Sequence, residues 1–585
     1  MLGGNNTAAV NGITKPGVPG GQETVDAHGM RPSHRQGDIG SDTGRPRNAG
    51  LDRPAQHLPH ALEDAGLLDV RQSVGVFGST RGRYGRSLSG PASPNPPNAP
   101  NLRDDDASGS PLIAMLPPVY PEWLGTRRFT TFHGCRFPYV VGAMARGIAT
   151  SHMVVEAAKN GLIGFFGAAG LRPPVVGEAI DQIEASVSPG TPWGSNLIHM
   201  PDHPERERDM VNLYLERAVR RVSASAFMAL SPDIVRYSAR GITITASGEI
   251  ERRNHVFAKI SRPEVAAHFL APPPSDLLRE LAAAGEITEA QADHQSKLPV
   301  AEDITVEADS GGHTDNRPLA ALFPIIAAQR DQLAAEHGYT RPIRLGAAGG
   351  IGTPHAVAAA FQLGADYVLT GSINQAAVES GLSEDGRAML ADCGVADVMM
   401  APAADMFERG AKVQVLKKGT LFAVKAQRLY EIYRKNDAFD TVPAKDRTWL
   451  ESQIFDGSYA DAWARTRAYQ ATSNPALAAK ADNDPKLQLA MIFRRFLFMA
   501  SRWACDGNSD RRADYQIWCG PAMGSFNAWV RGSFLEAPEN RTVGQIALNL
   551  LWGACIATRV QQLRVCGIDV PDRQSWWSPK RIALG

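Results

Sequence analysis

The stretch LGAAGGIGT, residues 345–353, decides the fold class of this chain. It begins as an apolar strand, turns at Gly349-Gly350 and ends on Thr353, which precedes Pro354 in a pattern typical of a helix start. Glycines let backbone N–H groups approach an anion closely, and the dipole of the following helix favours negative charge. The stretch therefore predicts a β-strand, an anion-binding turn and an α-helix in succession.

A second turn of this kind follows about 20 residues later, where an apolar strand ends in Thr370-Gly371-Ser372. In (β/α)₈ barrels the loops after strands seven and eight form a recurring phosphate site. We therefore predict a phosphate site at these two turns, Gly349-Gly350 and Gly371-Ser372. The alternative for each turn is a tight connection without a ligand.

Outward from these turns, short apolar runs alternate with amphipathic stretches over residues 118–425, which is typical of repeated βα units. The chain carries eight candidate strands: Tyr139–Gly142, Leu162–Phe166, Gly194–Ile198, Arg221–Ser225, Val256–Ile260, Ile304–Ala308, Ile343–Ala347 and Tyr367–Thr370. Their number and spacing predict an α/β fold, a (β/α)₈ TIM barrel. A doubly wound open sheet is the alternative, because a strand count does not prove closure.

Two regions lack the alternation of strands and helices. Residues of about 262–300, after the fifth strand, hold Pro272-Pro273-Pro274 and two amphipathic helix candidates. This helical insertion is predicted either as a lid or substrate wall over the barrel mouth, or as a surface decoration. Residues 426–585 show helical periodicity and are predicted to form a C-terminal all-α domain.

Residues 1–115 are rich in Gly, Pro, Asn, Asp and Arg and almost lack hydrophobic periodicity. The segment Ser89–Asn101 (SGPASPNPPNAPN) cannot build a core and is predicted to be a flexible linker. We predict that the whole segment is a disordered tail.

The bulk composition limits the class of protein. Of 585 residues, 61 are Lys or Arg and 61 are Asp or Glu, so the formal net charge is zero. This balance gives no electrostatic reason to propose a nucleic-acid or membrane partner, and no apolar run reaches the roughly 18 residues of a spanning helix. Six scattered cysteines lack metal-site spacing, which argues against a zinc site and a disulfide framework and favours a cytoplasmic protein.

The sixth strand ends in EADSGGHTD, residues 307–315. Gly311 and Gly312 would let a flat ring system lie against the backbone. His313 would then face the barrel mouth, where an imidazole can donate a proton or polarise a carbonyl; the alternative is a structural histidine. Asp309 would either orient His313 or cap the turn.

Polar or small residues also follow other strands. Burying the charge of Lys259, near the end of the fifth strand, costs free energy unless the ammonium group meets an anion. Lys259 is therefore predicted to contact an electron-rich cofactor ring or to pair with the carboxylate of Glu307 or Asp309. Asn196 is predicted to bind a cofactor or to bond within its own turn. Ala143 and Met144 suit the edge of a planar ring, or plain core packing.

Together these segments resemble the flavin-dependent barrel family that includes nitronate monooxygenases and FMN-type enoyl-acyl-carrier-protein reductases. The resemblance is closer to the trans-acting enoyl reductases of polyketide and polyunsaturated fatty acid synthases, and it covers roughly residues 118–565. It rests on seven motifs: VGAMARGIAT (141–150), GLIGFFGAAGL (161–171), EADSGGHTDNRPL (307–319), GAAGGIGTPHA (346–356), LTGSINQA (369–376), APAADMFERGAKVQVLKKGT (401–420) and DYQIWCGPAMGSFNAWVRG (514–532).

The resemblance implies FMN as the bound cofactor, NADPH as electron donor, and a 2-enoyl thioester on an acyl carrier protein as substrate. Carried over by position, it implies that the predicted phosphate turns hold FMN and that Ala143, Met144, Asn196 and Lys259 line the isoalloxazine. His313 matches the histidine that is catalytic in the nitronate branch. Lys259 is our second catalytic candidate.

Three other functions stay open from the sequence. The first is nitronate oxidation with O₂ at the same flavin. The second is a phosphosugar isomerase or aldolase that uses the phosphate site for its substrate. The third is a non-catalytic role, in which the helical domain docks the chain on a megasynthase. The sequence does not decide the oligomeric state, and a homo-oligomer stays open.

Overall fold

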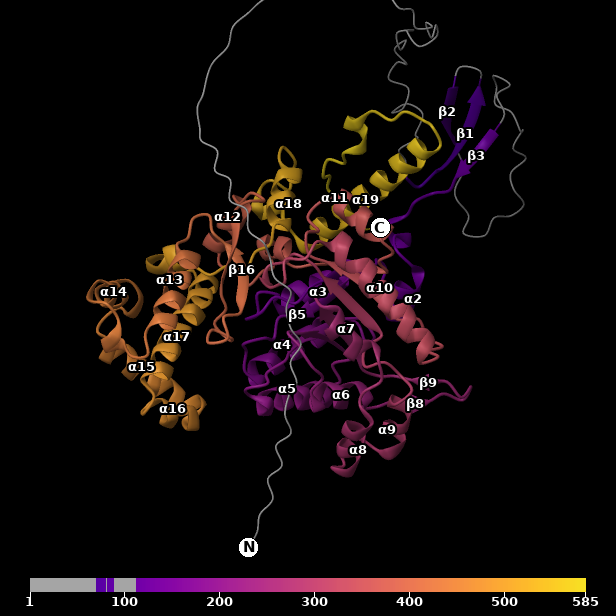
Figure 1. Cartoon of the computed structure of the whole chain (residues 1–585). Helices are drawn as coiled ribbons and strands as arrows, with labels where there is room; N and C mark the ends of the chain where they lie inside the picture. The colour runs from indigo at the N-terminus through magenta and orange to yellow at the C-terminus, as the bar shows by residue number, and fades with distance from the viewer. Residues whose placement is uncertain (1–69, 80–81, 89–111, 585) are drawn as a thin grey trace, which may run out of the picture. The chain divides into compact units, whose positions relative to one another are not determined.

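The computed structural model describes residues 70–79, 82–88 and 112–584, and at its centre is a closed barrel (Figure 1). Eight parallel strands close in the order β10-β11-β13-β14-β4-β5-β6-β7. Their bounds are β4 (Tyr139–Val141), β5 (Ile163–Phe166), β6 (Gly194–Ile198), β7 (Arg221–Ser225), β10 (His255–Ile260), β11 (Asp303–Glu307), β13 (Arg344–Ala348) and β14 (Tyr367–Thr370). The eight predicted strands are confirmed, and the pairing of β14 with β4 excludes the open sheet.

Seven of the strands are followed by a helix that packs outside the barrel. These helices are α3 (Ser151–Lys159), α4 (Pro173–Ser186), α5 (Pro204–Glu216), α6 (Pro232–Ala239), α7 (Pro263–Leu270), α10 (Leu319–Glu336) and α11 (Pro354–Gln362). The Thr353-Pro354 helix start is confirmed, since the Thr353 hydroxyl accepts from the Ala356 N–H at 3.2 Å. An N-terminal cap of this kind fixes the direction of the chain as it leaves the mouth.

Aromatic side chains fill the amino-terminal half of the barrel interior. Phe165, Phe257 and Tyr367 point inward and meet Phe129 of helix α2 (Arg127–His133), which closes that end. Gly346 makes room for them, because a Cβ there would lie 2.2 Å from the Tyr367 ring. With this end filled, a ligand can reach the barrel only from the carboxyl ends of the strands.

Charged residues lie beneath this aromatic plug. Asp303 at the start of β11 is fully buried and accepts two hydrogen bonds from Arg344, at 2.6 and 2.7 Å. It also lies 3.1 Å from the imidazole of His133, which in turn accepts from Arg221. The paired charges tie α2 to three barrel strands.

The eighth helix of the barrel comes from far downstream in the chain. Helix α19 (Val543–Val565) packs on α11 and on α3, the seventh and first outer helices, and so fills the position after β14. Residues 426–585 are helical as predicted. The prediction that residues 426–585 form one separate domain is wrong, however, because α19 packs on the barrel.

Within the described residues, α19 is the one helix long and apolar enough to cross a membrane. Its most apolar 18-residue window is 83% buried inside the protein. The apolar residues therefore cover the barrel, as expected of a core helix.

The middle of the segment between β14 and α19 forms a helical lobe whose own core comes from residues 401–500 (Figure 1, orange), while buried residues near its two ends, such as Leu390 and Phe526, join the core of the barrel. The elements of the segment are α12 (Glu384–Ala391), β15 (Val398–Pro402), β16 (Lys412–Leu416), α13 (Phe422–Lys435), α14 (Ala444–Leu450), α15 (Tyr459–Ser473), α16 (Pro475–Ala481), α17 (Pro485–Asp506) and α18 (Ala522–Val530). Because the segment leaves the barrel at the carboxyl end of β14, it begins at the barrel mouth.

The insertion after the fifth strand does not cover the mouth. Its helices α8 (Ser275–Ala283) and α9 (Glu289–Gln295) come after α7, which has already returned to the amino end of the barrel. Arg252, just before β10, donates to the carbonyls of Pro299 and Val300 at 2.7 and 3.2 Å, which places the end of the insertion there. Of the two alternatives, the lid is wrong and the surface decoration is correct.

The predicted disordered tail contains strands. The strands β1 (Ser73–Ser79), β2 (Gly82–Leu88) and β3 (Leu112–Leu116) form an antiparallel sheet in the order β2-β1-β3. Val74 and Val76 alternate with small residues and are fully buried, a strand pattern that the surrounding glycines and serines conceal. The prediction is wrong for these strands, and the linker Ser89–Asn101 lies outside the described residues.

Candidate active site at the barrel mouth

Two turns lie side by side at the carboxyl ends of β13 and β14. Gly349 and Gly350 have φ angles of +87° and +69°, which favour glycine. A Cβ at Gly349 would lie 2.6 Å from the Ala308 carbonyl carbon, so this glycine allows the β11 loop to approach. A Cβ at Gly350 or Gly371 would meet nothing within 4 Å. These two glycines therefore face open space.

Backbone donors in these turns are free to bind an anion. Among the residues that the structure describes, the N–H groups of Gly350, Gly371 and Ser372 have no hydrogen-bond acceptor. Gly350 is exposed and Gly371 and Ser372 are half-buried, so these donors are accessible to a ligand, and helix α11 begins four residues after Gly350. The two predicted turns thus form one cradle with the chemistry of a phosphate site.

The far end of the helical lobe forms one wall of this cradle. The Gly520 N–H donates to the Ser372 hydroxyl at 3.0 Å, and Gln375 donates to the Trp518 carbonyl. A Cβ at Gly352 would lie 2.1 Å from the Ala522 carbonyl oxygen. Sequence reasoning noticed this segment only as a family motif, because no local pattern assigns residues 518–522 to the cradle.

The glycines after β11 contact protein backbone. Gly312 and His313 form the short strand β12, which pairs with β16. A Cβ at Gly311 would lie about 3 Å from the backbone of Cys519, so Gly311 allows that segment to pack. Cys519 therefore occupies the Cβ side of Gly311, and contact of a cofactor ring with Gly311 and Gly312 stays a prediction. Gly312 has a φ of +82° and turns the chain toward His313.

His313 pairs with a carboxylate that the sequence did not reveal. Its Nε2 lies 3.2 Å from Oδ1 of Asp405, in the turn between β15 and β16, and the two side chains are 36% and 50% exposed. Burial lowers the pKa of His313, but the hydrogen bond and charge of Asp405 outweigh it and raise the pKa above its ordinary value. His313 therefore carries a proton more readily than a free histidine.

Asp309 has a structural role. Its carboxylate accepts from Asn316 at 2.9 Å and from Gln414 at 2.7 Å. These bonds hold the turn after β11 against β16. Of the two alternatives for Asp309, capping the turn is therefore the correct one, and Asp405 orients His313.

Lys259 and Glu307 form an ion pair beside His313. The Lys259 ammonium donates to Glu307 Oε1 at 2.9 Å, and the Ser310 hydroxyl donates to the same oxygen at 3.0 Å. Both charges also act on the pKa of His313, in opposite directions. The predicted pairing of Lys259 with Glu307 is confirmed, and the half-buried ammonium keeps further donor capacity toward the mouth.

The other predicted ring contacts lie at the mouth with different degrees of burial. Asn196 is buried, and its Nδ2 donates to the Ser223 carbonyl at 2.9 Å and to the Ser225 hydroxyl at 3.1 Å. Internal bonding of its amide nitrogen is thus observed. Met144 is buried and Ala143 half-buried, after β4. Their contact with a ring remains a prediction.

Two family models match the chain. A model of nitronate monooxygenase matches residues 127–435, which includes the complete strand set of the barrel. A model of the inserted helical domain of acyl-carrier-protein S-malonyltransferase matches residues 436–515, in the helical lobe. The two matches divide the chain near the end of α13.

Two relatives are named for polyunsaturated fatty acid synthesis and polyketide biosynthesis. The chain is 44% identical over 467 residues to one of the polyunsaturated fatty acid synthase subunits of Thraustochytrium sp., a match to 79% of this chain and 31% of that relative. It is 42% identical over 433 residues to polyketide biosynthesis protein PksE of Bacillus subtilis, a match to 74% of this chain and 56% of PksE. The chain thus spans less than two thirds of either relative.

A solved structure matches more completely. The enoyl reductase domain of MlnA from Bacillus amyloliquefaciens is 37% identical, with a TM-score of 0.72. The match covers 76% of this chain and 99% of that domain. The barrel and the helical lobe therefore occur together in a domain of that structure.

Proposed function

The chain belongs to the nitronate monooxygenase family, a family of flavin-dependent oxidoreductases, and we propose that it is an FMN-dependent enoyl reductase of polyketide or polyunsaturated fatty acid synthesis. Its substrate would be a 2-enoyl thioester on an acyl carrier protein, with NADPH as the source of electrons. The observation that carries the proposal is the 37% identity to the MlnA enoyl reductase domain over 99% of that domain.

The cradle at the barrel mouth fits the phosphate of FMN. Three backbone N–H groups in the cradle have no acceptor among the described residues, namely those of Gly350, Gly371 and Ser372. The space beside Gly350 and Gly371 is empty, because a Cβ at either position would meet nothing within 4 Å. Asn196 on β6 and Lys259 on β10 stand on either side of β7 at the same mouth, where they would contact the ring. When bound, FMN would supply the hydride that the β-carbon of the enoyl thioester receives.

A valine at Gly371 is expected to weaken FMN binding about 100-fold, because its side chain would fill the cradle and remove charge-assisted bonds to two amides. The φ and ψ of Gly371 are −124° and −74°, outside the regions favoured by residues with a Cβ, so valine and alanine should both strain the turn to a similar degree. Flavin absorbance per protein after dialysis measures the effect.

The graded variant Gly371→Ala serves as the control and should lose less flavin than Gly371→Val. Melting temperatures of the flavin-free proteins should agree. Full flavin occupancy in the valine variant would place the phosphate elsewhere.

The chain's own groups support reduction of an α,β-unsaturated thioester. Negative charge develops on the thioester oxygen when the β-carbon is reduced, and a positioned donor stabilises that charge. His313, whose pKa Asp405 raises, would be the donor that gives a proton to this oxygen. The ion pair of Lys259 with Glu307 would keep the charge balance of the mouth close to neutral.

Asp405→Asn is expected to shift the alkaline limb of the kcat/KM profile to lower pH. Asp405 raises the pKa of His313, so its removal lowers that pKa, and the proton donor is lost earlier as pH rises. At pH 6 the variant should retain most of its activity, and it should fall behind the wild type as pH rises. Steady-state rates between pH 5.5 and 9 measure the shift, and an unmoved limb would contradict the assigned donor.

One experiment tests the proposed function directly. Purified protein should show flavin absorbance, and under anaerobic conditions it should oxidise NADPH in proportion to added crotonyl-pantetheine. Mass spectrometry should identify the saturated thioester. A colourless, folded protein that takes up no FMN on reconstitution would overturn the proposal.

Nitronate oxidation is the second candidate, because the nitronate monooxygenase model matches the barrel. It predicts oxygen consumption with an alkyl nitronate in the absence of NADPH. Turnover of the nitronate, together with no reduction of the enoyl thioester, would establish this reaction instead.

A further inference from the structure

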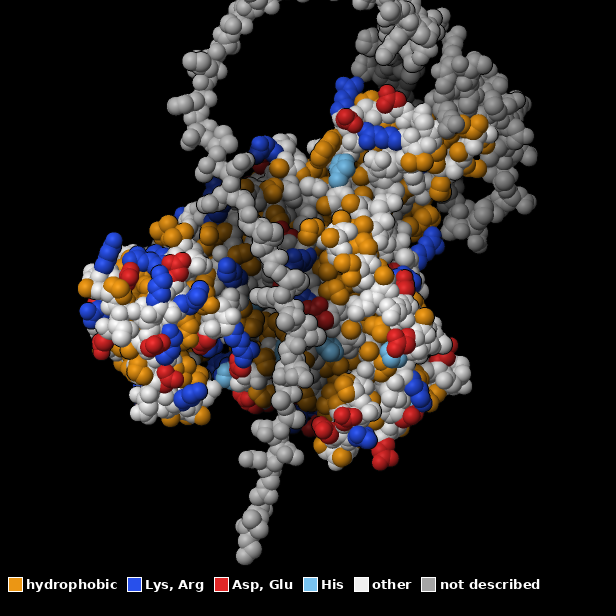
Figure 2. All heavy atoms as spheres, viewed as in Figure 1, with side chains coloured by type: hydrophobic (Ala, Val, Ile, Leu, Met, Phe, Trp, Pro, Cys, Tyr) orange, Lys and Arg blue, Asp and Glu red, His pale blue; other side chains and the backbone are white. Residues whose placement is uncertain are grey.

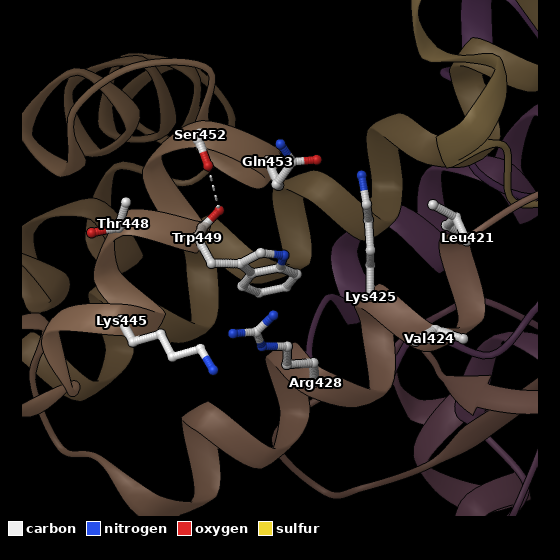
Figure 3. A pocket seen from close by; sticks show the side chains of 9 residues that line it. All are labelled: Leu421, Val424, Lys425, Arg428, Lys445, Thr448, Trp449, Ser452 and Gln453. Carbon is white, nitrogen blue, oxygen red and sulfur yellow. Dashed lines mark hydrogen bonds between the residues drawn. The ribbon is translucent and has the colours of Figure 1, made fainter.

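A groove of about 540 Å³ lies on the helical lobe, between the start of α13 and the segment that contains α14 (Figure 3). Its lining residues are Leu421, Val424, Lys425, Arg428, Lys445, Thr448, Trp449, Ser452 and Gln453. The lining contains three cations and no Asp or Glu. Figure 2 shows acidic and basic side chains mixed over the face that it draws.

One edge of the groove is apolar and unusually exposed. Leu421 and Val424 are 55% and 63% exposed, although large aliphatic side chains near the start of a helix normally turn toward the core. They lie three residues apart and therefore on one side of the chain at the start of α13. Together they form an apolar ridge that none of the described residues covers.

The cations are held in position along the groove. Arg428 lies 3.9 Å from the Trp449 ring centre and pairs with Asp446 at 2.6 Å, while Lys425 pairs with Asp514 at 2.6 Å. Lys445 has no ion pair among the described residues. Figure 3 shows its amine and the Arg428 guanidinium pointing toward the same space beside Trp449. Because Asp446 offsets the charge of Arg428, Lys445 leaves a net positive charge in this space, which attracts an anionic group from outside.

We infer that this groove docks the acidic, amphipathic helix of an acyl carrier protein, an inference that rests on the proposed function. An acidic helix matches the cations by charge, and its apolar positions match the Leu421–Val424 ridge. A small anion alone would leave that ridge uncovered. The matched model of the acyl-carrier-protein S-malonyltransferase helical domain includes Lys445, Trp449 and Gln453, which supports a carrier protein as the occupant.

The groove is connected to the barrel mouth by a short stretch of chain. Strand β16 pairs Gln414 with Gly312, the neighbour of His313. Leu421 follows Gln414 after seven residues, which span at most about 25 Å. A carrier protein in the groove could therefore extend its flexible prosthetic arm along β16 toward His313.

Two variants test the docking surface by direct binding. Lys445→Glu and Val424→Glu change exposed side chains outside the catalytic site. Each should weaken binding of a phosphopantetheinylated polyketide synthase carrier domain about tenfold, measured by isothermal titration calorimetry at low salt. Lys480→Glu on α16 is the matched control, since it reverses an exposed lysine outside the groove, and it should bind as the wild type does.

Kinetics separate this inference from the proposed function. With crotonyl-carrier substrate the two groove variants should raise KM about tenfold, while kcat/KM for crotonyl-pantetheine stays at the wild-type value. If the wild type reduces neither substrate but the binding pattern holds, the proposed reaction fails and the docking surface stands. Groove variants that bind the carrier domain as tightly as the Lys480→Glu control, or a wild type that does not bind it, would overturn the docking surface.

Discussion

Replacing His313 by alanine is expected to lower kcat for the enoyl thioester by about 100- to 10,000-fold. This is the range for removal of a positioned general acid, and the proposed reaction has one proton to deliver where charge develops on the thioester oxygen. His313 lies at the mouth, and the carboxylate of Asp405, 3.2 Å from its Nε2, raises the pKa of its imidazole. Steady-state kinetics at pH 7 would measure the loss.

Two further measurements make the His313 result specific. Flavin content should be unchanged, because the phosphate cradle lies on β13 and β14 and His313 on β12. Single-turnover oxidation of NADPH, which precedes protonation of the substrate, should change by less than about threefold. His152→Ala, on the outer helix α3, is the control and should keep full activity. If His313→Ala retains kcat within about threefold of the wild type, solvent or another group donates the proton.

Asp303→Asn is expected to reduce the free energy of unfolding by about 3–5 kcal/mol, the usual cost of breaking a buried ion pair by removing one partner. Asp303 is fully buried and binds both Arg344 and His133. An asparagine would leave the buried guanidinium of Arg344, with Arg221 nearby, uncompensated at the closed end of the barrel. Urea unfolding monitored by circular dichroism would measure the change.

The control for this variant is Asp293→Asn, an exposed carboxylate paired with Lys297. Exposed pairs contribute little, so its unfolding curve should overlay that of the wild type. Flavin content of the folded fraction of Asp303→Asn should be normal, because Asp303 lies at the opposite end of β11 from the mouth. An unfolding midpoint of Asp303→Asn equal to that of Asp293→Asn would show that the buried pair does not stabilise the barrel.

The same cluster sets the response of stability to acid. Burial would raise the pKa of Asp303, but Arg344 and His133 outweigh it and hold that pKa well below its usual range. Burial, together with neighbouring cations, lowers the pKa values of His133 and His255. The unfolded chain therefore takes up protons at these histidines first, and stability falls as pH drops below about 6.5. The carboxylate adds to this loss below about pH 4.

The sequence by itself determined the parts of the protein that depend on neighbouring residues. Eight apolar runs of strand length, each followed by helical material, predicted the barrel. The glycines of two successive turns predicted a phosphate cradle, and the residues after β11 placed His313 at the mouth. These signals are local, because backbone conformation at a turn and periodic burial are properties of a few consecutive residues.

Only the tertiary structure decided which distant segments complete the site. Asp405 reaches His313 because β16 pairs with β12, and Gly520 reaches Ser372 because the helical lobe returns to the mouth. No local pattern of residues carries such a pairing. The side of the barrel that receives an insertion is also a property of topology, which is why the lid prediction for residues 262–300 was wrong.

The eighth outer helix, α19, most clearly separates what the sequence determined from what the tertiary structure decided. The sequence marked residues of α19 as an apolar helix, since their 3.6-residue periodicity is local. It did not assign that helix to the barrel, because the helical lobe separates it from β14 along the chain. The gap between α11 and α3 is defined only once the strands have closed, and burial of the apolar surface of α19 in that gap then decides where the helix packs. The sequence thus determined the elements and the chemistry of the phosphate turns, and the closed barrel decided which distant residues stand beside them.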